Sequence, residues 1–187
     1  MTTASTVSTW YGEIPAQLLD RLQNIKLVIF DVDGVFSDGR IYLGNQGEEF
    51  KAFNTRDGFG VKGLLNNRIE VAVITGRRSE IVEQRMQALG VNHIYQGIED
   101  KISCYEELNR NLQLTDEQIA CMGDDVPDVQ MIQRAGVGVA VNDAHPWVQQ
   151  QADYVTSLRG GYGAVRELTD LILLSQGHLQ LHGGVSL

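Results

Sequence analysis

Residues 27–39, LVIFDVDGVFSDG, place two aspartates, Asp31 and Asp33, directly after four apolar residues. A continuous apolar run of this kind predicts a strand that is covered on both faces of a sheet. Carboxylates are rarely buried unless a cation or a hydrogen-bond donor compensates them. The stretch therefore indicates either a buried strand that ends in an ordinary acidic turn, or a strand that delivers two carboxylates to a functional site.

Polar side chains also follow the other predicted buried strands. Thr75 follows VAVI, Asp124 follows IACMG, and Lys101 stands near the start of the helix predicted after HIYQG. Two further carboxylates, Asp125 and Asp128, lie within a turn of Asp124. Ligands of open α/β sheets bind beyond the carboxyl ends of the strands, so we expect these groups to meet at one sheet edge. Several carboxylates cannot share that space without a counterion, and Mg²⁺ is the natural oxygen-ligated candidate.

This set of groups predicts phosphoryl transfer. A carboxylate beside the cation can attack phosphorus and form an aspartyl-phosphate. Thr75 could then hydrogen-bond the transferring phosphoryl oxygens, and Lys101 could neutralise them and orient the nucleophile. A second carboxylate two residues further along could protonate the leaving alcohol and later activate water.

The elements that must position these groups alternate between strand and helix from residue 27 to about residue 175. Apolar runs predict strands at residues 27–30, 69–75, 93–97, 119–123, 137–141 and 152–156. Helical periodicity predicts helices at residues 14–25, 57–67, 79–90, 99–112, 126–136 and 163–176. The order predicts an α/β fold with a doubly wound parallel sheet, in a single domain over residues 1–187.

Two segments stand outside this alternation. Residues 40–53, RIYLGNQGEEFKAF, predict an inserted β-hairpin with the four-residue loop GNQG. Residues 177–187 end in small and polar residues and predict a flexible C-terminal tail.

Composition limits the possible partners and compartments. Apolar residues make up 43% and charged residues 21% of the 187, which is typical of globular proteins. The net charge of −9 argues against general binding to nucleic acid or to anionic membranes. We find no signal-peptide pattern and no membrane span, and we expect Cys104 and Cys121 to be reduced and structural. These features predict a cytoplasmic protein.

Four short segments resemble the motifs of the haloacid dehalogenase (HAD) superfamily of phosphatases, in the same order. DVDG resembles the first motif, which implies Asp31 as nucleophile and Asp33 as general acid/base. VITG resembles the second through Thr75, Lys101 fits the third, and GDDVPD resembles the fourth through Asp124. The resemblance also implies a Rossmann-like core.

By the same resemblance, Mg²⁺ is held by Asp31, Asp124 and the backbone carbonyl of Asp33. Asp125 or Asp128 is implied in support, and the sequence leaves the choice between them open.

The intervals between these motifs are too short for the cap domain that many HAD enzymes carry. Only 41 residues separate Asp33 from Thr75, and 25 separate Thr75 from Lys101. We therefore expect a capless enzyme whose open site is covered by something else. The hairpin is the candidate, because it would expose Ile41, Leu43 and Phe50 to a partner.

The segments GVFSDGRIYLG, FNTRDGFGVK, TGRRS and GDDVPD resemble the 3-deoxy-D-manno-octulosonate 8-phosphate (KDO 8-phosphate) phosphatases of lipopolysaccharide biosynthesis. This resemblance implies Mg²⁺-dependent hydrolysis of a sugar-acid phosphate to KDO and phosphate. It also implies a homotetramer in which hairpins meet and each subunit helps to close its neighbour's site.

The resemblance further implies which residues contact the substrate. Besides Asp33, Thr75 and Lys101, the implied set is Asn54, Thr55, Arg56, Asp57, Gly58, Lys62, Gly76, Arg77 and Arg85. Guanidinium groups suit a substrate that carries both a phosphate and a carboxylate, because they bind such groups through two hydrogen bonds.

Simpler interpretations of the basic residues stay open. Arg85 and Lys62 could lie on solvated helix faces, and Arg56 with Asp57 could form a weak local ion pair.

Alternatives to the function also remain. An acidic residue in place of Arg77 would favour a nine-carbon sialic-type sugar 9-phosphate, and another small phosphomonoester is possible. A phosphorylatable receiver domain would place its acidic pair before the phosphorylated aspartate and would have no counterpart of Asp33. A non-catalytic, tetramer-forming regulatory module would not need all of Asp31, Asp33, Thr75, Lys101 and Asp124.

Overall fold

The computed structural model of the chain describes residues 5–179. Its centre is a six-stranded sheet in the order β10-β9-β8-β3-β6-β7, in which every neighbouring pair is parallel. The strands are β3 (Leu27–Phe30), β6 (Glu70–Thr75), β7 (His93–Gln96), β8 (Ile119–Gly123), β9 (Val137–Ala140) and β10 (Tyr154–Val155). The chain runs outward from β3 to β7, then returns to the other side of β3. The strand order therefore reverses between β3 and β8, where a doubly wound sheet opens its binding crevice.

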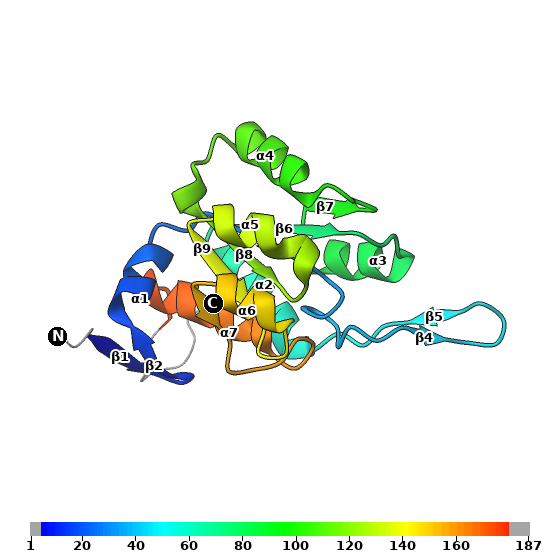
Figure 1. The fold of residues 1–187 in the computed structure, drawn as a ribbon, viewed down its shortest axis with the longest axis horizontal. Coiled ribbons are helices and arrows are strands. Elements are labelled where there is room, and N and C mark those ends of the chain that lie inside the picture. Colours follow the sequence, from blue (N-terminus) through cyan, green and yellow to red (C-terminus); the bar gives the residue numbers. More distant parts are fainter. Residues whose placement is uncertain (1–4, 180–187) are drawn as a thin grey trace.

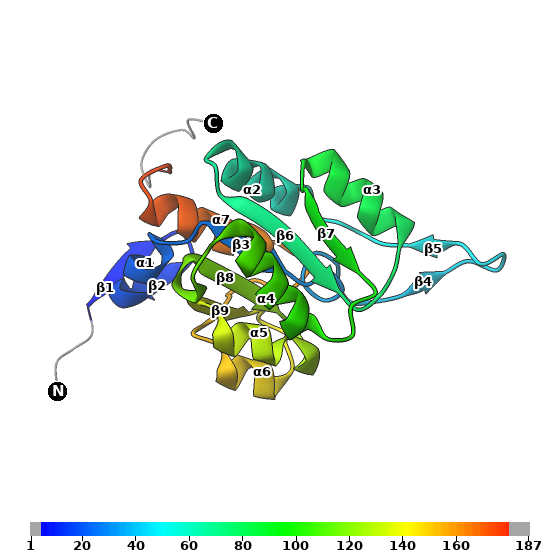
Figure 2. The same ribbon diagram turned by 90° about the horizontal axis from the view of Figure 1, so that it is seen from above.

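Helices cover both faces of this sheet (Figure 2). The helices are α1 (Ala16–Leu22), α2 (Thr55–Asn66), α3 (Glu80–Leu89), α4 (Lys101–Leu112), α5 (Val129–Arg134), α6 (Pro146–Gln151) and α7 (Ala164–Ser175). Successive strand residues point to opposite faces, so Val28 and Phe30 pack in the cluster under α1, α2 and α7, while Leu27 and Ile29 pack in the cluster under α4 and α5. The predicted doubly wound α/β fold is confirmed.

The inserted hairpin consists of β4 (Tyr42–Leu43) and β5 (Glu49–Phe50), which pair antiparallel. Residues 44–48 separate the two strands, one residue more than the predicted loop GNQG, and Gly44 N–H bonds the carbonyl of Glu48 at 2.8 Å across this loop. Figure 1 shows the hairpin reaching well beyond the body of the fold. Leu43 is 72% exposed and Phe50 60%, so the predicted exposure of these apolar side chains is confirmed.

The N-terminal segment differs from its prediction. Residues 5–15 contain a second hairpin, β1 (Thr6–Thr9) and β2 (Gly12–Pro15), which the sequence did not indicate. The predicted helix over residues 14–25 is therefore too long at both ends, since α1 begins only after Pro15 and stops at Leu22. Ile14 and Ile25 are nevertheless buried, so the apolar spacing correctly marked the core-facing residues.

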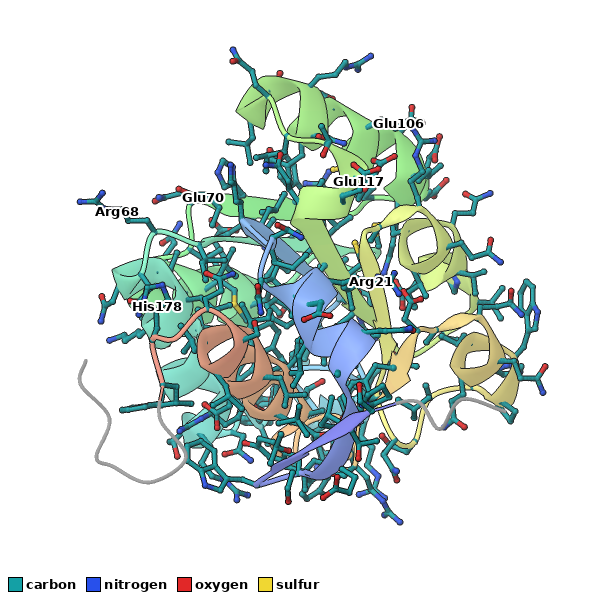
Figure 3. All side chains as sticks on the ribbon, turned by 90° about the vertical axis from the view of Figure 1, so that its left-hand side faces the viewer. Arg21, Arg68, Glu70, Glu106, Glu117 and His178 are labelled. Carbon is teal, nitrogen blue, oxygen red and sulfur yellow. The ribbon has the colours of Figure 1, made fainter. Side chains whose placement is uncertain are left out.

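The end of the molecule opposite the extended hairpin holds the amino ends of the strands (Figure 3). There Arg21 of α1 donates to the carbonyl of Gly136 at 2.9 Å and pairs with Asp153 at 2.8 Å. These contacts attach α1 to the segments on either side of β9.

Two expectations concern the chain ends. Gly177, His178 and Leu179 are described, and Leu179 is buried at 5% exposure, so the start of the predicted tail packs on the core. Residues 180–187 of that tail lie outside the described residues, as do residues 1–4, and the single domain over residues 1–187 stays a prediction. None of the helices between residues 5 and 179 has the length and apolar character needed to cross a membrane.

Candidate active site

A cavity of about 550 Å³ opens at the carboxyl ends of β3, β6 and β8. Its walls are formed by Asp31, Asp33, Gly39, Thr75, Gly76, Arg77, Ile98, Glu99, Lys101, Asp124, Asp125, Pro127 and Asp128. All four catalytic candidates and the two predicted metal-binding carboxylates, Asp31 and Asp124, therefore line one cavity.

The loop that follows β3 carries the first two carboxylates. Asp31 N–H bonds the carbonyl of Met122 in β8 at 3.0 Å, which fixes the end of the strand. The chain then coils tightly, since the N–H groups of Val35, Phe36 and Ser37 all bond the carbonyl of Val32. Both carboxylates are thus presented from a rigid turn rather than a loose loop.

Glycines allow close approach to this turn. Gly34 has φ +91°, and a β-carbon there would lie 2.1 Å from Oδ2 of Asp124. Gly160, far along the chain, lies so close that its β-carbon would come within 1.6 Å of the carbonyl oxygen of Gly34. Gly161 N–H also bonds the carbonyl of Val35 at 2.9 Å, so the segment after β10 braces the turn from behind.

Lys101, the first residue of α4, lies between two carboxylates. Its Nζ donates to Oδ1 of Asp31 at 2.8 Å and to Oδ1 of Asp128 at 2.7 Å, and all three side chains are buried. Burial lowers the pKa of Lys101, but the charges of Asp31 and Asp128 outweigh it and leave the pKa raised. Burial, with the charge of Asp128, raises the pKa of Asp31 to about 7 despite Lys101.

Asp124 shares this crowding. Burial raises its pKa to about 8, and the charges of Asp31, Asp128 and Asp125 add to the effect. One lysine thus does not balance the carboxylates. Oxygen atoms of Asp31, Asp124 and Asp128 all lie within 4.8 Å of one another, and such hard donors suit Mg²⁺. The residues present therefore fit the predicted ion.

The structure distinguishes the two supporting carboxylates. Asp128 is buried, bonds Lys101, and its Oδ2 accepts from the N–H groups of Asp124 (3.1 Å) and Asp125 (3.3 Å). Asp125 is exposed and accepts from Val126 N–H at the start of the following 3-10 turn. Asp128 is therefore the residue that shapes the loop holding Asp124.

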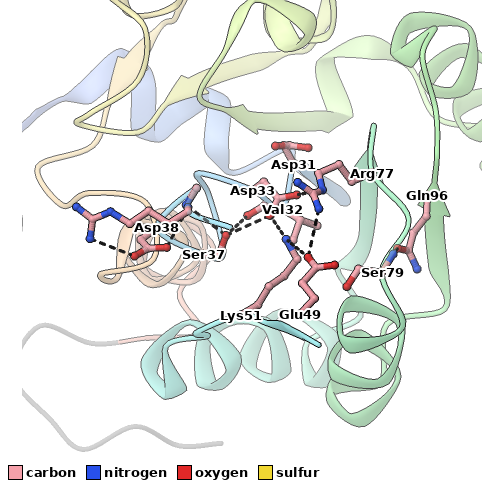
Figure 4. Close-up of polar contacts among 12 residues, drawn as sticks. Asp31, Val32, Asp33, Ser37, Asp38, Glu49, Lys51, Arg77, Ser79 and Gln96 are labelled. Atoms are coloured by element: carbon pink, nitrogen blue, oxygen red, sulfur yellow. Dashed lines mark hydrogen bonds and ion pairs between the residues drawn. The ribbon is translucent and has the colours of Figure 1, made fainter. Parts of the chain in front are cut away.

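Asp33 lies beside Lys51 and Glu49 of the hairpin and beside Arg77 (Figure 4). Its carboxylate contacts the ammonium group of Lys51, and its Oδ2 lies 4.0 Å from Nε of Arg77. Thr75 ends β6 and is 3% exposed at the cavity wall. Lys51 was missed by the sequence analysis; the signal that could have found it is its spacing two residues from Glu49, on the face of the hairpin opposite Phe50.

The residues predicted to contact the sugar divide into two groups. Gly76 and Arg77 line the cavity, whereas seven others do not: Asn54, Thr55, Arg56, Asp57, Gly58, Lys62 and Arg85. Lys62 and Thr55 are exposed on α2. Gly58 packs against Arg85, because a β-carbon on Gly58 would lie 2.5 Å from the Arg85 guanidinium.

The polar groups at the start of α2 bond the segment that leads into α7 and the first turn of α7 itself. Asn54 caps α2 by accepting from Arg56 N–H at 3.0 Å, and its amide donates to the carbonyl of Gly161 at 3.4 Å. Asp57 accepts from Arg166 N–H at 2.9 Å, while its buried Oδ2 has no hydrogen-bond partner among the described residues. Burial raises the pKa of Asp57 to about 6. These residues join α2 to α7 within the subunit.

The doubly wound sheet, with carboxylates, a hydroxyl and a lysine at the ends of its strands, defines a haloacid dehalogenase-like hydrolase. A sequence model of the family described as haloacid dehalogenase-like hydrolase matches residues 93–165 of the chain.

Comparison with known proteins narrows this class. The chain is 49% identical to the 3-deoxy-D-manno-octulosonate 8-phosphate phosphatase KdsC of Yersinia pestis, over 100% of both chains. It is 48% identical to KdsC of Escherichia coli K12, over 98% of this chain and 97% of that one. The chain belongs to the family of the 3-deoxy-D-manno-octulosonate 8-phosphate phosphatases.

Solved structures agree with this assignment. The crystal structure of the Yersinia pestis phosphatase superposes with a TM-score of 0.94 over 99% of each chain, at 49% identity. The Moraxella catarrhalis phosphatase, crystallised with magnesium, phosphate and KDO, superposes with a TM-score of 0.85 at 39% identity, over 87% of this chain and 93% of that one.

Proposed function

We propose that the chain hydrolyses KDO 8-phosphate to KDO and inorganic phosphate, as a phosphoric monoester hydrolase of lipopolysaccharide biosynthesis. The observation that carries this proposal is the meeting of Asp31, Asp33 and Lys101 in one cavity, in a chain that matches KDO 8-phosphate phosphatases along its whole length.

Asp31 acts as the nucleophile. Lys101 holds its Oδ1, so Oδ2 is the oxygen that attacks phosphorus, forming the Asp31–phosphate bond as the bond to the substrate's C8 oxygen breaks. Thr75 at the cavity wall donates to the transferring phosphoryl oxygens. Mg²⁺, when bound by Asp31, Asp124 and the carbonyl of Asp33, supplies the positive charge that lets two anions approach.

Asp33 acts as general acid and then as general base. In the first step its carboxyl proton passes to the C8 oxygen, which leaves as an alcohol. In the second step the same carboxylate takes a proton from the water that attacks the aspartyl-phosphate. Inorganic phosphate and free Asp31 are released.

Selectivity for a sugar acid is assigned to basic groups beyond the phosphate. Arg77 lies at the cavity with its side chain 41% exposed, so its guanidinium is available to the substrate carboxylate. An arginine at this position supports KDO 8-phosphate over a nine-carbon sialic-type sugar 9-phosphate. The latter remains the alternative substrate.

We further propose a homotetramer. The exposed apolar side chains of Ile41, Leu43 and Phe50 support it, because a protruding apolar hairpin is a liability unless it is covered. In such a tetramer, the seven candidates that do not line the subunit's own cavity would contact the sugar bound in a neighbouring subunit. Absence of nucleic-acid and membrane partners and a cytoplasmic location stay predictions from the sequence.

The proposal is tested by measuring phosphate release from KDO 8-phosphate, a sialic-type 9-phosphate and p-nitrophenyl phosphate. The expected order places KDO 8-phosphate first, with activity lost in EDTA. Asp31→Asn should abolish turnover of all three, whereas the matched control Asp20→Asn, an exposed residue of α1, should not. A wild-type chain that releases no phosphate from KDO 8-phosphate, or an active Asp31→Asn variant, would overturn the proposal.

A further inference from the structure

Lys51 lies at the root of the extended hairpin, one residue beyond β5. Its side chain is 0% exposed, and its ammonium group contacts the carboxylate of Asp33 and lies 3.3 Å from Oε1 of Glu49. Figure 4 shows Lys51 and Glu49 directed toward Asp33 at the cavity. The hairpin therefore reaches the proposed acid/base carboxylate directly.

Arg77 closes this arrangement into a ring of alternating charge. Its guanidinium donates to Oε1 of Glu49 at 3.4 Å, and its Nε lies 4.0 Å from Oδ2 of Asp33. Of the four charged side chains, Lys51 alone is wholly enclosed, since the side chains of Arg77, Glu49 and Asp33 are 41%, 23% and 21% exposed. Lys51 is thus the one member of the ring whose side chain is fully buried.

A hairpin that needed only stability would not place a lysine here. Burying an ammonium group costs free energy unless carboxylates surround it, and an apolar side chain of similar length would avoid that cost. The neighbouring residue Phe50 is 60% exposed, so the apolar side chain faces outward and the charged one inward. This is the reverse of the pattern that burial alone favours.

We propose that Lys51 is a positioning residue for general acid/base catalysis. It holds Oδ1 of Asp33, a residue that lines the cavity, and so leaves Oδ2 to exchange the proton with the leaving oxygen and later with water. This inference rests on the proposed function. It implies that general acid catalysis by Asp33 depends on the hairpin being docked against the turn after β3.

The consequence is a selective dependence on the leaving group. An alkyl phosphate such as KDO 8-phosphate or glycerol 3-phosphate loses a poor leaving group and needs the proton from Asp33. p-Nitrophenyl phosphate loses a phenolate that is stable without protonation. A variant that misplaces Asp33 should therefore lose alkyl phosphatase activity and keep most of its aryl phosphatase activity.

The experiment compares kcat/KM of Lys51→Met for these two classes of ester, at saturating Mg²⁺. We expect a loss of about 10²-fold for the alkyl esters, the usual size of a general-acid contribution, and less than about tenfold for the aryl ester. Lys51→Arg should recover part of the alkyl activity. Lys26→Met, an exposed lysine before β3, is the matched control and should change neither.

A second readout identifies the partner of Lys51. In an Asp33→Asn background, Lys51→Met should cause no further loss of alkyl activity, because the two residues act as one unit. If Lys51→Met does not fold, Lys51→Gln, which keeps a donor without the charge, is measured in the same way. The proposal would be overturned if a folded Lys51 variant kept the wild-type ratio of alkyl to aryl activity. It would also be overturned if the losses caused by Lys51→Met and Asp33→Asn were additive.

The outcomes also separate this inference from the proposed function. A wild-type chain that hydrolyses glycerol 3-phosphate but not KDO 8-phosphate would refute the proposed substrate while the test of Lys51 proceeds on the other esters. A wild-type chain that hydrolyses no phosphomonoester would refute both.

Discussion

Replacing Lys101 with methionine removes the ammonium group that holds Asp31 and Asp128 together inside the fold. Two charge-assisted hydrogen bonds of 2.8 and 2.7 Å are lost, and two buried carboxylates remain without their cation. Removing one partner of a buried ion pair typically costs 3–5 kcal/mol. We expect the free energy of unfolding to fall by about 3 kcal/mol at pH 8 in EDTA, the lower end of that range, because Asp31 can escape part of the cost by taking up a proton.

The same reasoning fixes the pH dependence. The pKa of Asp31 in the folded wild type is already raised to about 7, and loss of Lys101 raises it further. A carboxyl whose pKa is higher in the folded than in the unfolded state destabilises the fold as pH rises through that interval. The variant should therefore lose less stability at pH 6, where Asp31 is protonated, than at pH 8.

The assay is urea unfolding of Lys101→Met, wild type and the control Lys26→Met at pH 6 and pH 8, with phosphatase activity measured alongside. Activity should fall by at least about 10²-fold, since the nucleophile loses its orientation. A variant as stable as wild type at pH 8, or one whose deficit is the same at both pH values, would refute the reasoning.

Three further predictions follow from the site and the hairpin. Mg²⁺ should raise the melting temperature of wild type but not of Asp124→Asn, and scanning calorimetry with and without EDTA checks this; equal shifts would contradict the assigned ligand. Leu43→Asp should dissociate the proposed homotetramer and lower activity toward KDO 8-phosphate more than toward p-nitrophenyl phosphate, as light scattering and both assays would reveal. A wild-type chain that is monomeric, or a dissociated variant with the wild-type activity ratio, would argue against it. The free energy of unfolding of Asp57→Asn, relative to that of wild type, should rise by about 1 kcal/mol between pH 5 and pH 8. Burial raises the pKa of the Asp57 carboxyl to about 6, so its ionisation opposes folding of the wild type at pH values above its pKa in the unfolded chain. Urea unfolding of both proteins at both pH values measures this change, and a stability difference that is the same at pH 5 and pH 8 would count against it.

Much of the fold and the centre of the site could be predicted because their signals are local. The runs LVIF and VAVI are apolar throughout, and β3 and β6 are buried on both faces in consequence. Because parallel strands end at one sheet edge, the residues that follow them meet there, and Asp31, Thr75 and Asp124 line one cavity.

What sequence reasoning missed depends on contacts between distant residues. The strands β1 and β2 are mostly exposed and polar, so neither shows a pattern that burial would impose. Lys51 meets Asp33 only because the hairpin folds back onto the turn after β3; the spacing of Lys51 from Glu49 places both on one face of the hairpin but does not reveal this tertiary contact. The contacts of Asn54 with Gly161 and of Asp57 with Arg166 are likewise tertiary and were not indicated by the sequence, whereas the substrate role implied for the NTRDG segment stays a prediction.

Gly160 and Gly161 pack behind the Asp31 turn, and this contact affects how the chain folds while it is being synthesised. The ribosome releases the turn early, but β3 occupies the middle of the sheet, and its neighbour β8 is synthesised much later. The glycines that back the turn follow later still. A nascent chain that ends before Gly160 would therefore carry Asp31, Lys101 and Asp128 without the segment that packs behind the turn. We therefore expect the turn to take its final shape only after the segment that follows β10 has been synthesised and has docked.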